Sequence, residues 1–172
     1  MLKKTLLLLF ISMHLVANAQ REIIPTDGFK ISGKVKKEKS FSMGELVQIS
    51  KQVKIPDQII YNHKGEIKDT LTQLKGVSLK TVLASVEYVY EKPKELNEFY
   101  LVCTASDGYK VVFSWNEIYN TENGNQIYFI TEMDGKPLKE LDSRIILIAT
   151  SDSKSGRRFI KALEKIEVRR AE

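Results

Sequence analysis

Histidine and cysteine, which are frequent in metal sites and in nucleophilic catalysis, are scarce in this chain. The sequence contains one cysteine, Cys103, and two histidines, of which His63 lies outside the first twenty residues. A single imidazole cannot build the multi-histidine clusters typical of zinc sites. No serine lies in a nucleophile-elbow pattern that would use His63 as a general base. We therefore expect neither a metal site nor a catalytic residue, and one cysteine excludes a disulfide within the chain.

The remaining candidates for chemistry have simpler structural interpretations. Cys103 lies among apolar residues of a predicted strand, where a buried thiol acts as a small hydrophobic side chain. The alternative for Cys103 is a reactive thiol or a ligand. Asp107 precedes Gly108, and because Asp-Gly forms turns, we expect Asp107 to shape a hairpin rather than to catalyse. His63 is expected in an exposed loop.

The first nineteen residues are predicted to be a secretory leader. Lys3 and Lys4 precede an apolar run at residues 6–11, and Ala17 and Ala19 form an Ala-x-Ala cleavage pattern. The apolar run is shorter than the roughly 20 residues that a membrane-spanning helix needs. We therefore expect export, cleavage and no membrane insertion afterwards. Whether residues 20–172 would stay in the periplasm or be secreted is left open.

After cleavage the chain has the size and charge of one ordinary domain. Removing nineteen of the 172 residues leaves 153, which fits a single domain with a substantial core. Loss of Lys3 and Lys4 lowers the number of basic residues from 27 to 25 against 22 acidic ones, so the net charge is +3. Nucleic acid binding normally requires a dense basic stripe with interleaved aromatic residues. No nucleic acid partner is therefore expected.

The hydrophobic pattern predicts one α+β domain. Ser-x-x-Glu pairs beginning at Ser42 and Ser114 predict capping boxes at two helix starts, and Ser78 precedes a third helix. The segment Ser106-Asp107-Gly108 predicts the tight turn of a hairpin. Pro56 favours an edge or bulged strand around it. Strands are expected at residues 28–35, 52–62, 99–105, 109–113, 126–131, 144–150 and 162–169, with a lysine-rich turn after the first and a polar loop at 62–74.

Four short segments, in this order, resemble the molybdopterin-binding domain of the sulfite oxidase family. They are Gly76-Val77-Ser78-Leu79, which resembles a helix start of that family, the turns Asp107-Gly108-Tyr109 and Gly135-Lys136-Pro137-Leu138, and the basic segment from Lys161 to Val168. The resemblance spans roughly residues 29–168. It implies a mixed-sheet, sulfite oxidase-like molybdopterin-binding domain fold with a few short helices.

The resemblance also implies a phosphate site in the basic segment. Lys161 matches the position of a basic residue that holds the cofactor's phosphate, and Arg157 and Arg158 could assist through bidentate contacts. A dianionic phosphate needs fixed cations or backbone amides to hold it. The alternative is a solvated basic face made of Lys154, Arg157, Arg158, Lys161 and Lys165 and offset by Asp152 and Glu164.

The metal site of the family is where this chain departs from the pattern. In catalytic members a cysteine thiolate just before the Gly-Val segment is the metal's protein ligand, and the matching segment here, residues 52–74, contains no cysteine. Oxygen and imidazole donors do not replace soft sulfur without changing the preferred metal. Molybdopterin therefore stays a candidate cofactor by resemblance, whereas molybdenum is not expected.

These observations predict an exported binding or accessory domain without molybdenum redox catalysis. Its partner would be a small, pterin-like ligand or a protein of the cell envelope. One alternative is a molybdopterin-dependent oxidoreductase component, with the metal held without protein sulfur or supplied in a complex. The other is an envelope interaction domain that binds no small molecule and exposes a large apolar patch.

Overall fold

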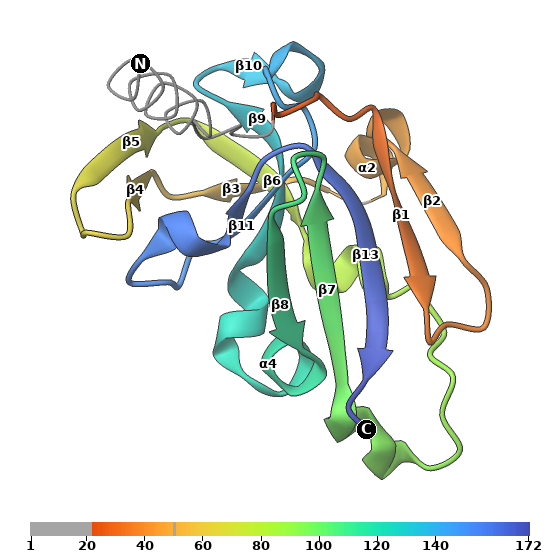
Figure 1. The fold of residues 1–172 in the computed structure, drawn as a ribbon. Coiled ribbons are helices and arrows are strands. Elements are labelled where there is room, and N and C mark those ends of the chain that lie inside the picture. The colour runs from red at the N-terminus through yellow and green to blue at the C-terminus, as the bar shows by residue number, and fades with distance from the viewer. Residues whose placement is uncertain (1–21, 50) are drawn as a thin grey trace, which may run out of the picture.

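The computed structural model describes residues 22–49 and 51–172, so the expected leader lies outside the described residues. The described chain forms two larger β-sheets, a separate two-stranded hairpin and several short helices (Figure 1). One strand pair is parallel and the others are antiparallel, so the predicted α+β class with a mixed sheet is confirmed. No helix in the described part of the chain has the length and apolar character needed to cross a bilayer.

The first sheet has five strands and contains the first and last strands of the described chain. Its order is β2 (Lys39–Ser42), β1 (Gly28–Gly33), β13 (Leu163–Arg170), β7 (Phe99–Ala105) and β8 (Lys110–Ser114). Strand β13 is central, because it pairs in parallel with β1 on one side and antiparallel with β7 on the other. The predicted hairpin around residues 106–108 is confirmed as the β7–β8 connection.

The second sheet lies against the inner face of the first. Its order is β12 (Phe159–Ile160), β11 (Ile146–Ala149), β9 (Ile127–Met133), β6 (Leu74–Ser78) and β3 (Val53–Ile55), with β10 (Lys136–Pro137) beside β9. All four residues of β11 are buried, as expected for a strand covered on both faces. Phe29 of β1 stacks on Phe129 of β9 with 4.8 Å between ring centroids, so the two sheets share one core.

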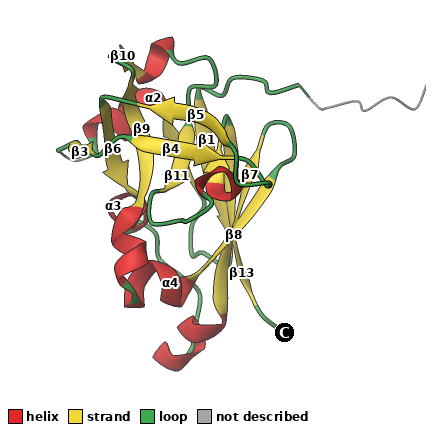
Figure 2. Cartoon of the chain, turned by 90° about the vertical axis from the view of Figure 1, so that its left-hand side faces the viewer, coloured by secondary structure: helices red, strands yellow, loops and turns green. Residues whose placement is uncertain are grey.

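Short helices begin where the serine pattern predicts. Helix α2 (Met43–Gln48) starts with a complete capping box, in which the Ser42 Oγ accepts from the Glu45 backbone N–H and the Glu45 carboxylate accepts from the Ser42 N–H. Ser78 caps α3 (Leu79–Leu83) and Ser114 caps α4 (Trp115–Asn120). Seen from the side, α3 and α4 lie toward the lower end of the molecule (Figure 2). The 3₁₀ helices are η2 (Pro93–Glu98), η3 (Glu122–Gln126), η4 (Leu138–Glu140) and η5 (Ser155–Arg158).

Two sequence predictions about elements were wrong, and one strand was missed. Residues 62–74 are not a loop, because β5 (Ile67–Leu71) pairs with β4 (Gln58–Tyr61) and β6 begins at Leu74. The single strand expected at residues 52–62 is two strands interrupted at Pro56, which has no N–H to donate to a sheet. The lysine-rich turn expected after the first strand lies at residues 34–38, and β2, which was not predicted, follows it at a sheet edge.

The Gly-Val segment is strand rather than helix. Gly76 and Val77 belong to β6 and pair with β9, and the helix begins two residues later at Leu79. A side chain at Gly76 would bring its Cβ within 2.5 Å of the Phe129 carbonyl oxygen. The glycine therefore allows β6 and β9 to approach closely.

Candidate functional site

A cavity of about 450 Å³ lies between the β4–β5 hairpin, the β7–β8 turn and the segment that runs from η5 through β12. This volume is within the range of small-molecule pockets. We call it the basic cavity. It is lined by Ile23, Ile60, Tyr61, Asn62, His63, Lys68, Asp69, Ala105, Asp107, Tyr109, Gly156, Arg157, Phe159 and Lys161.

Two of the three predicted phosphate-binding residues reach this cavity. Arg157 and Lys161 line it together with Lys68, a third cation, while Asp69 and Asp107 supply two carboxylates. Among residues 22–49 and 51–172, none of the three cations takes part in an ion pair. Their charges are therefore available to an anion in the cavity.

The cavity also offers aromatic rings beside the cations. The Lys161 ammonium lies 5.3 Å from the centroid of the Phe159 ring, close enough for a cation–π contact. Tyr61 and Tyr109 contribute further rings to the wall. The Asp107 carboxylate is engaged in the turn, where it accepts from the Tyr109 N–H at 2.8 Å. The turn role predicted for Asp107 is thus confirmed, although Asp107 also faces the cavity.

Backbone contacts hold η5 against the neighbouring hairpins. The Ser155 hydroxyl donates to the Ile59 carbonyl at 2.6 Å, and the Tyr109 hydroxyl donates to the Arg157 carbonyl at 2.6 Å. Gly156 lies so close to β4 that a Cβ would sit 2.1 Å from the Tyr61 carbonyl oxygen. These contacts place Arg157 between the β4–β5 hairpin and the β7–β8 turn.

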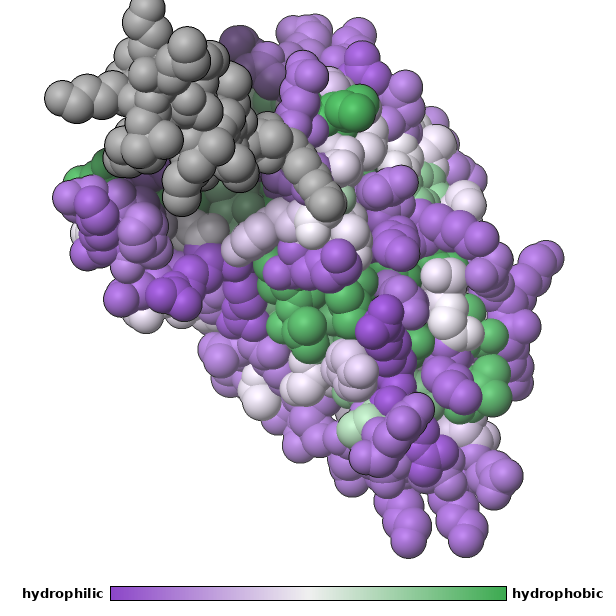
Figure 3. Space-filling view, viewed as in Figure 1, coloured by the Kyte–Doolittle hydropathy of each residue, from purple (hydrophilic) through white to green (hydrophobic). Residues whose placement is uncertain are grey.

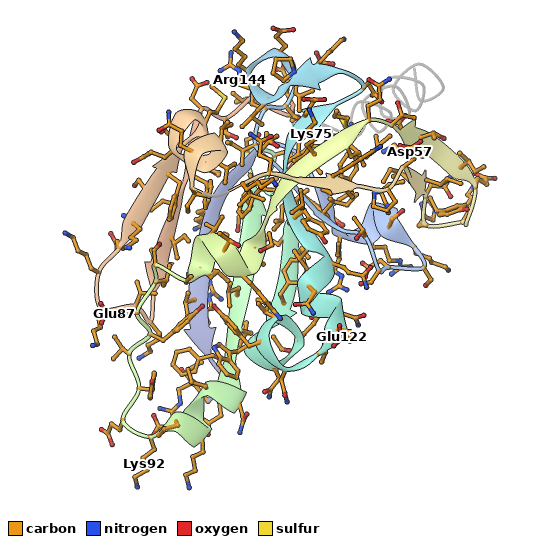
Figure 4. The ribbon with its side chains drawn as sticks, turned by 180° about the vertical axis from the view of Figure 1, so that it is seen from behind. Asp57, Lys75, Glu87, Lys92, Glu122 and Arg144 are labelled. Carbon is orange, nitrogen blue, oxygen red and sulfur yellow. The ribbon has the colours of Figure 1, made fainter. Side chains whose placement is uncertain are left out.

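The β4–β5 hairpin brings His63 and Lys68 to the cavity. At its tip, the Asn62 Oδ1 accepts from the backbone N–H groups of Lys64 and Glu66 at 2.9 and 3.0 Å. At its base, Asp57 (Figure 4) accepts from the Gln73 N–H at 3.2 Å. His63 is exposed in the tip, as predicted, and also lines the cavity, which was not predicted.

The sequence does contain a pattern that could have revealed this hairpin. Isoleucines at 59, 60 and 67 flank the segment Asn62-His63-Lys64-Gly65, and a short glycine-containing loop between apolar residues is a hairpin pattern. Gly65 adopts a φ of 88°, which suits glycine at a tight turn. The polar composition of residues 62–74 hid the pattern.

Arg158 does not line the basic cavity. Its Nε donates to the Asp152 Oδ2 at 2.6 Å, its Nη2 donates to the other oxygen of Asp152, and its Nη1 donates to a Glu117 oxygen. The guanidinium also lies 4.8 Å above the Phe113 ring. The hydrogen bond to Asp152 is the main cause of a raised Arg158 pKa, and that to Glu117 adds to it. The guanidinium of Arg158 is therefore bound by the carboxylates of Asp152 and Glu117.

The donors of this chain do not fit a thiolate-bound metal in the cavity. Cys103 is fully buried in β7, is absent from the cavity wall, and has a pKa that burial raises to about 12. Among the described residues, no group of three or more His, Cys, Asp or Glu side chains is arranged to hold a metal ion. The expectation that Cys103 is a buried small side chain is confirmed.

Exposed apolar side chains are scattered over the rest of the surface. The face in Figure 3 is largely hydrophilic, with a hydrophobic patch near its centre. The exposed large hydrophobic residues include Ile59 and Ile67 on the β4–β5 hairpin and Val112 on the edge strand β8. These residues bear on the alternative of a protein interaction surface.

Comparison with known proteins gives a likeness of fold. No family model and no curated protein matches the chain. Among solved structures, it is similar to the sulfane dehydrogenase SoxCD from Paracoccus pantotrophus, with a TM-score of 0.61 and 13% sequence identity. The match covers 89% of this chain and 39% of that one, so this chain spans about two fifths of its length. The arrangement of sheets and short helices described above is therefore a sulfite oxidase-like α+β fold.

Proposed function

We propose that this protein is an exported binding or accessory domain that holds an anionic, pterin-like small molecule in the basic cavity without molybdenum redox catalysis. One observation carries the proposal. Lys161 and Arg157 line the same cavity as the β4–β5 hairpin. This hairpin lies within residues 52–74, the segment in which the family resemblance expects the metal end of the cofactor. Two distant stretches of sequence thus meet where such a ligand would lie.

The cavity suits a ligand that combines an aromatic ring with a phosphate. Lys68, Arg157 and Lys161 have no acidic partner among residues 22–49 and 51–172, so a phosphate would meet available cations. Hydrogen bonds to charged groups contribute about 1.5–3 kcal/mol each. Phe159 and the two tyrosines offer faces for a planar ring. Bound molybdopterin would present both a ring and a phosphate to these residues.

The same residues argue against a resident molybdenum centre. The side chains that line the cavity carry oxygen and nitrogen donors, and the thiol of Cys103 is buried elsewhere. Since soft thiolate is the ligand that this chemistry uses, we assign no catalytic step to the cavity.

Two measurements on the natural protein test the proposal. Protein purified from its own compartment is analysed for molybdenum and, after oxidation, for pterin fluorescence. Recombinant protein is titrated with 6-hydroxymethylpterin monophosphate and with the same pterin lacking phosphate. We expect binding that depends on the phosphate and molybdenum far below one atom per chain.

Each other outcome favours one alternative. Pterin and molybdenum in near-equal amounts would favour an oxidoreductase component. Failure of both pterins to bind, together with a pterin-free natural protein, would favour an envelope interaction domain. Export is tested separately by sequencing the amino terminus of the natural protein, for which we expect Gln20 as the first residue.

A further inference from the structure

Arg157 and Arg158 are neighbours in sequence, and both line a shallow pocket beside residues 151–154, but only Arg157 also lines the basic cavity. Arg157 lines the basic cavity, whereas the Arg158 guanidinium lies over Phe113 and between Asp152 and Glu117. The side chains of Asp152, Arg158 and Glu117 are 15%, 21% and 24% exposed. This cluster is therefore a partly buried network rather than a loose surface ion pair.

The network joins three pieces of the fold. Asp152 precedes η5, Arg158 is its last residue, and Glu117 lies in the first turn of α4. The bidentate contact to Asp152 joins the two ends of the loop formed by residues 152–158. The contact to Glu117 binds this loop to α4. On the far side, Ser155 and the Arg157 carbonyl are bound by β4 and Tyr109. The loop is thus held from both sides.

The Arg158–Glu117 contact takes the place of half of a capping box at the start of α4. In α2, the carboxylate of Glu45 completes the capping box by accepting from the Ser42 backbone. In α4, Ser114 accepts from the Glu117 N–H at 2.9 Å, but the Glu117 carboxylate binds Arg158 instead of returning to Ser114. In α4, Glu117 therefore contributes its backbone N–H to the helix cap and its carboxylate to the contact with Arg158.

We propose that Arg158 is a positioning residue of the basic cavity, which anchors η5 through Asp152 and Glu117 so that Arg157 and Lys161 point at the same anion. This inference rests on the proposed function, because it assigns Arg158 a role in presenting the two cations that would bind the ligand. Arg158 itself does not contact the ligand.

Electrostatics and positioning predict opposite results for Glu117→Ala. Removing a carboxylate near an anion site strengthens anion binding if charge alone matters. If Glu117 anchors Arg158, the same change weakens binding of 6-hydroxymethylpterin monophosphate, by about tenfold on the scale typical of groups that orient a binding residue. The α4 cap should persist, because it uses only the backbone N–H of residue 117.

For a second variant, Arg158→Ala, the dissociation constant is measured over a range of salt concentrations. Exposed charge–charge contacts weaken as salt rises. Removal of a direct contact such as Lys161 should reduce the salt dependence of the dissociation constant, while removal of Arg158 should weaken binding and leave that dependence nearly unchanged. Arg170→Ala is the matched control, since Arg170 also joins two carboxylates, Glu95 and Glu98, and lines no part of the cavity.

Hydrogen exchange tests the anchor without any ligand. The Arg157 N–H, which donates to the Lys154 carbonyl at 3.0 Å, should exchange faster in both Arg158→Ala and Glu117→Ala and at the normal rate in Arg170→Ala. Unchanged exchange in the first two variants would overturn the inference whatever the ligand does. Stronger or unaltered binding by Glu117→Ala would also overturn it. If the unmodified protein does not bind the probe, the proposed function fails, while exchange still decides whether Arg158 anchors η5.

Discussion

Replacing Lys161 with alanine is the most direct test of the basic cavity. The Lys161 ammonium takes part in no ion pair among the described residues and lies 5.3 Å from the Phe159 ring centroid. A charge-assisted hydrogen bond to a phosphate contributes about 1.5–3 kcal/mol, and each 1.4 kcal/mol corresponds to about tenfold in affinity. Because Lys161 is only half-buried, we expect the lower end, about a tenfold loss for 6-hydroxymethylpterin monophosphate.

The same substitution should leave the fold intact. Its structural cost is the cation–π contact with Phe159, which is worth about 0.5–1 kcal/mol at an exposed site. For a chain of this size, 1 kcal/mol shifts the melting temperature by about 2–4 °C. Calorimetric unfolding should therefore show a decrease in melting temperature of no more than about 4 °C. The variant is then still folded in the binding assay, and its loss of affinity comes from the cavity.

Two further variants separate charge from shape. Lys161→Met keeps most of the stem over Phe159 but removes the charge, and should bind as poorly as Lys161→Ala. Lys165→Ala removes the same net charge from a residue that pairs with Glu167 and does not line the cavity, and should bind normally. Isothermal titration at fixed salt measures all three. Unchanged affinity in Lys161→Ala, or equal losses in Lys161→Ala and Lys165→Ala, would remove Lys161 from the site.

Other substitutions probe the cavity wall and the core. Gly156→Ala should lower the melting temperature and weaken ligand binding, because its Cβ would lie 2.1 Å from the Tyr61 carbonyl oxygen and force η5 away from β4; a variant as stable as the parent would contradict this close packing. Tyr109→Phe removes the hydroxyl that donates to the Arg157 carbonyl and should cost about 1 kcal/mol or less in urea unfolding, with no loss at all arguing against this contact. The Cys103 thiol should resist alkylation at pH 8 until the protein unfolds. Burial raises the pKa of Cys103 from 9.0 to about 12, so the unfolded thiol ionises first and stability should fall as pH rises between those values, by about 1.4 kcal/mol per pH unit; Cys103→Ala should remove that part of the pH dependence, and an unchanged profile would contradict it.

Local chemistry explains which elements were predictable from sequence. Helix starts at Ser42, Ser78 and Ser114 depend on a side chain and a backbone group three residues away, so their residue types are sufficient to find them. The β7–β8 turn likewise depends on Asp107 and Gly108. Strand β5 was missed because four of its five residues are exposed and show no alternation, so its pairing with β4 follows from tertiary structure.

The candidate site was predictable in part for the same reason. The basic segment was recognised from residue type and resemblance, and Arg157 and Lys161 do line one cavity. The separate contacts of Arg158 could not be predicted, because they depend on the η5 turn and on a carboxylate of α4 that lies 41 residues away in sequence. His63 and Lys68 were missed together with the hairpin that carries them. Their assignment to a ligand stays a prediction.

The central place of β13 has a consequence for how the protein is made. The ribbons β2–β1 and β7–β8 have no direct pairing in the five-stranded sheet and are joined only through β13. A nascent chain whose residues 163–170 are still in the ribosome tunnel cannot complete this sheet, and it leaves unpaired edges on β1 and β7 that attract other chains. The five-stranded sheet therefore forms as one unit only when β13 is available to join the two ribbons.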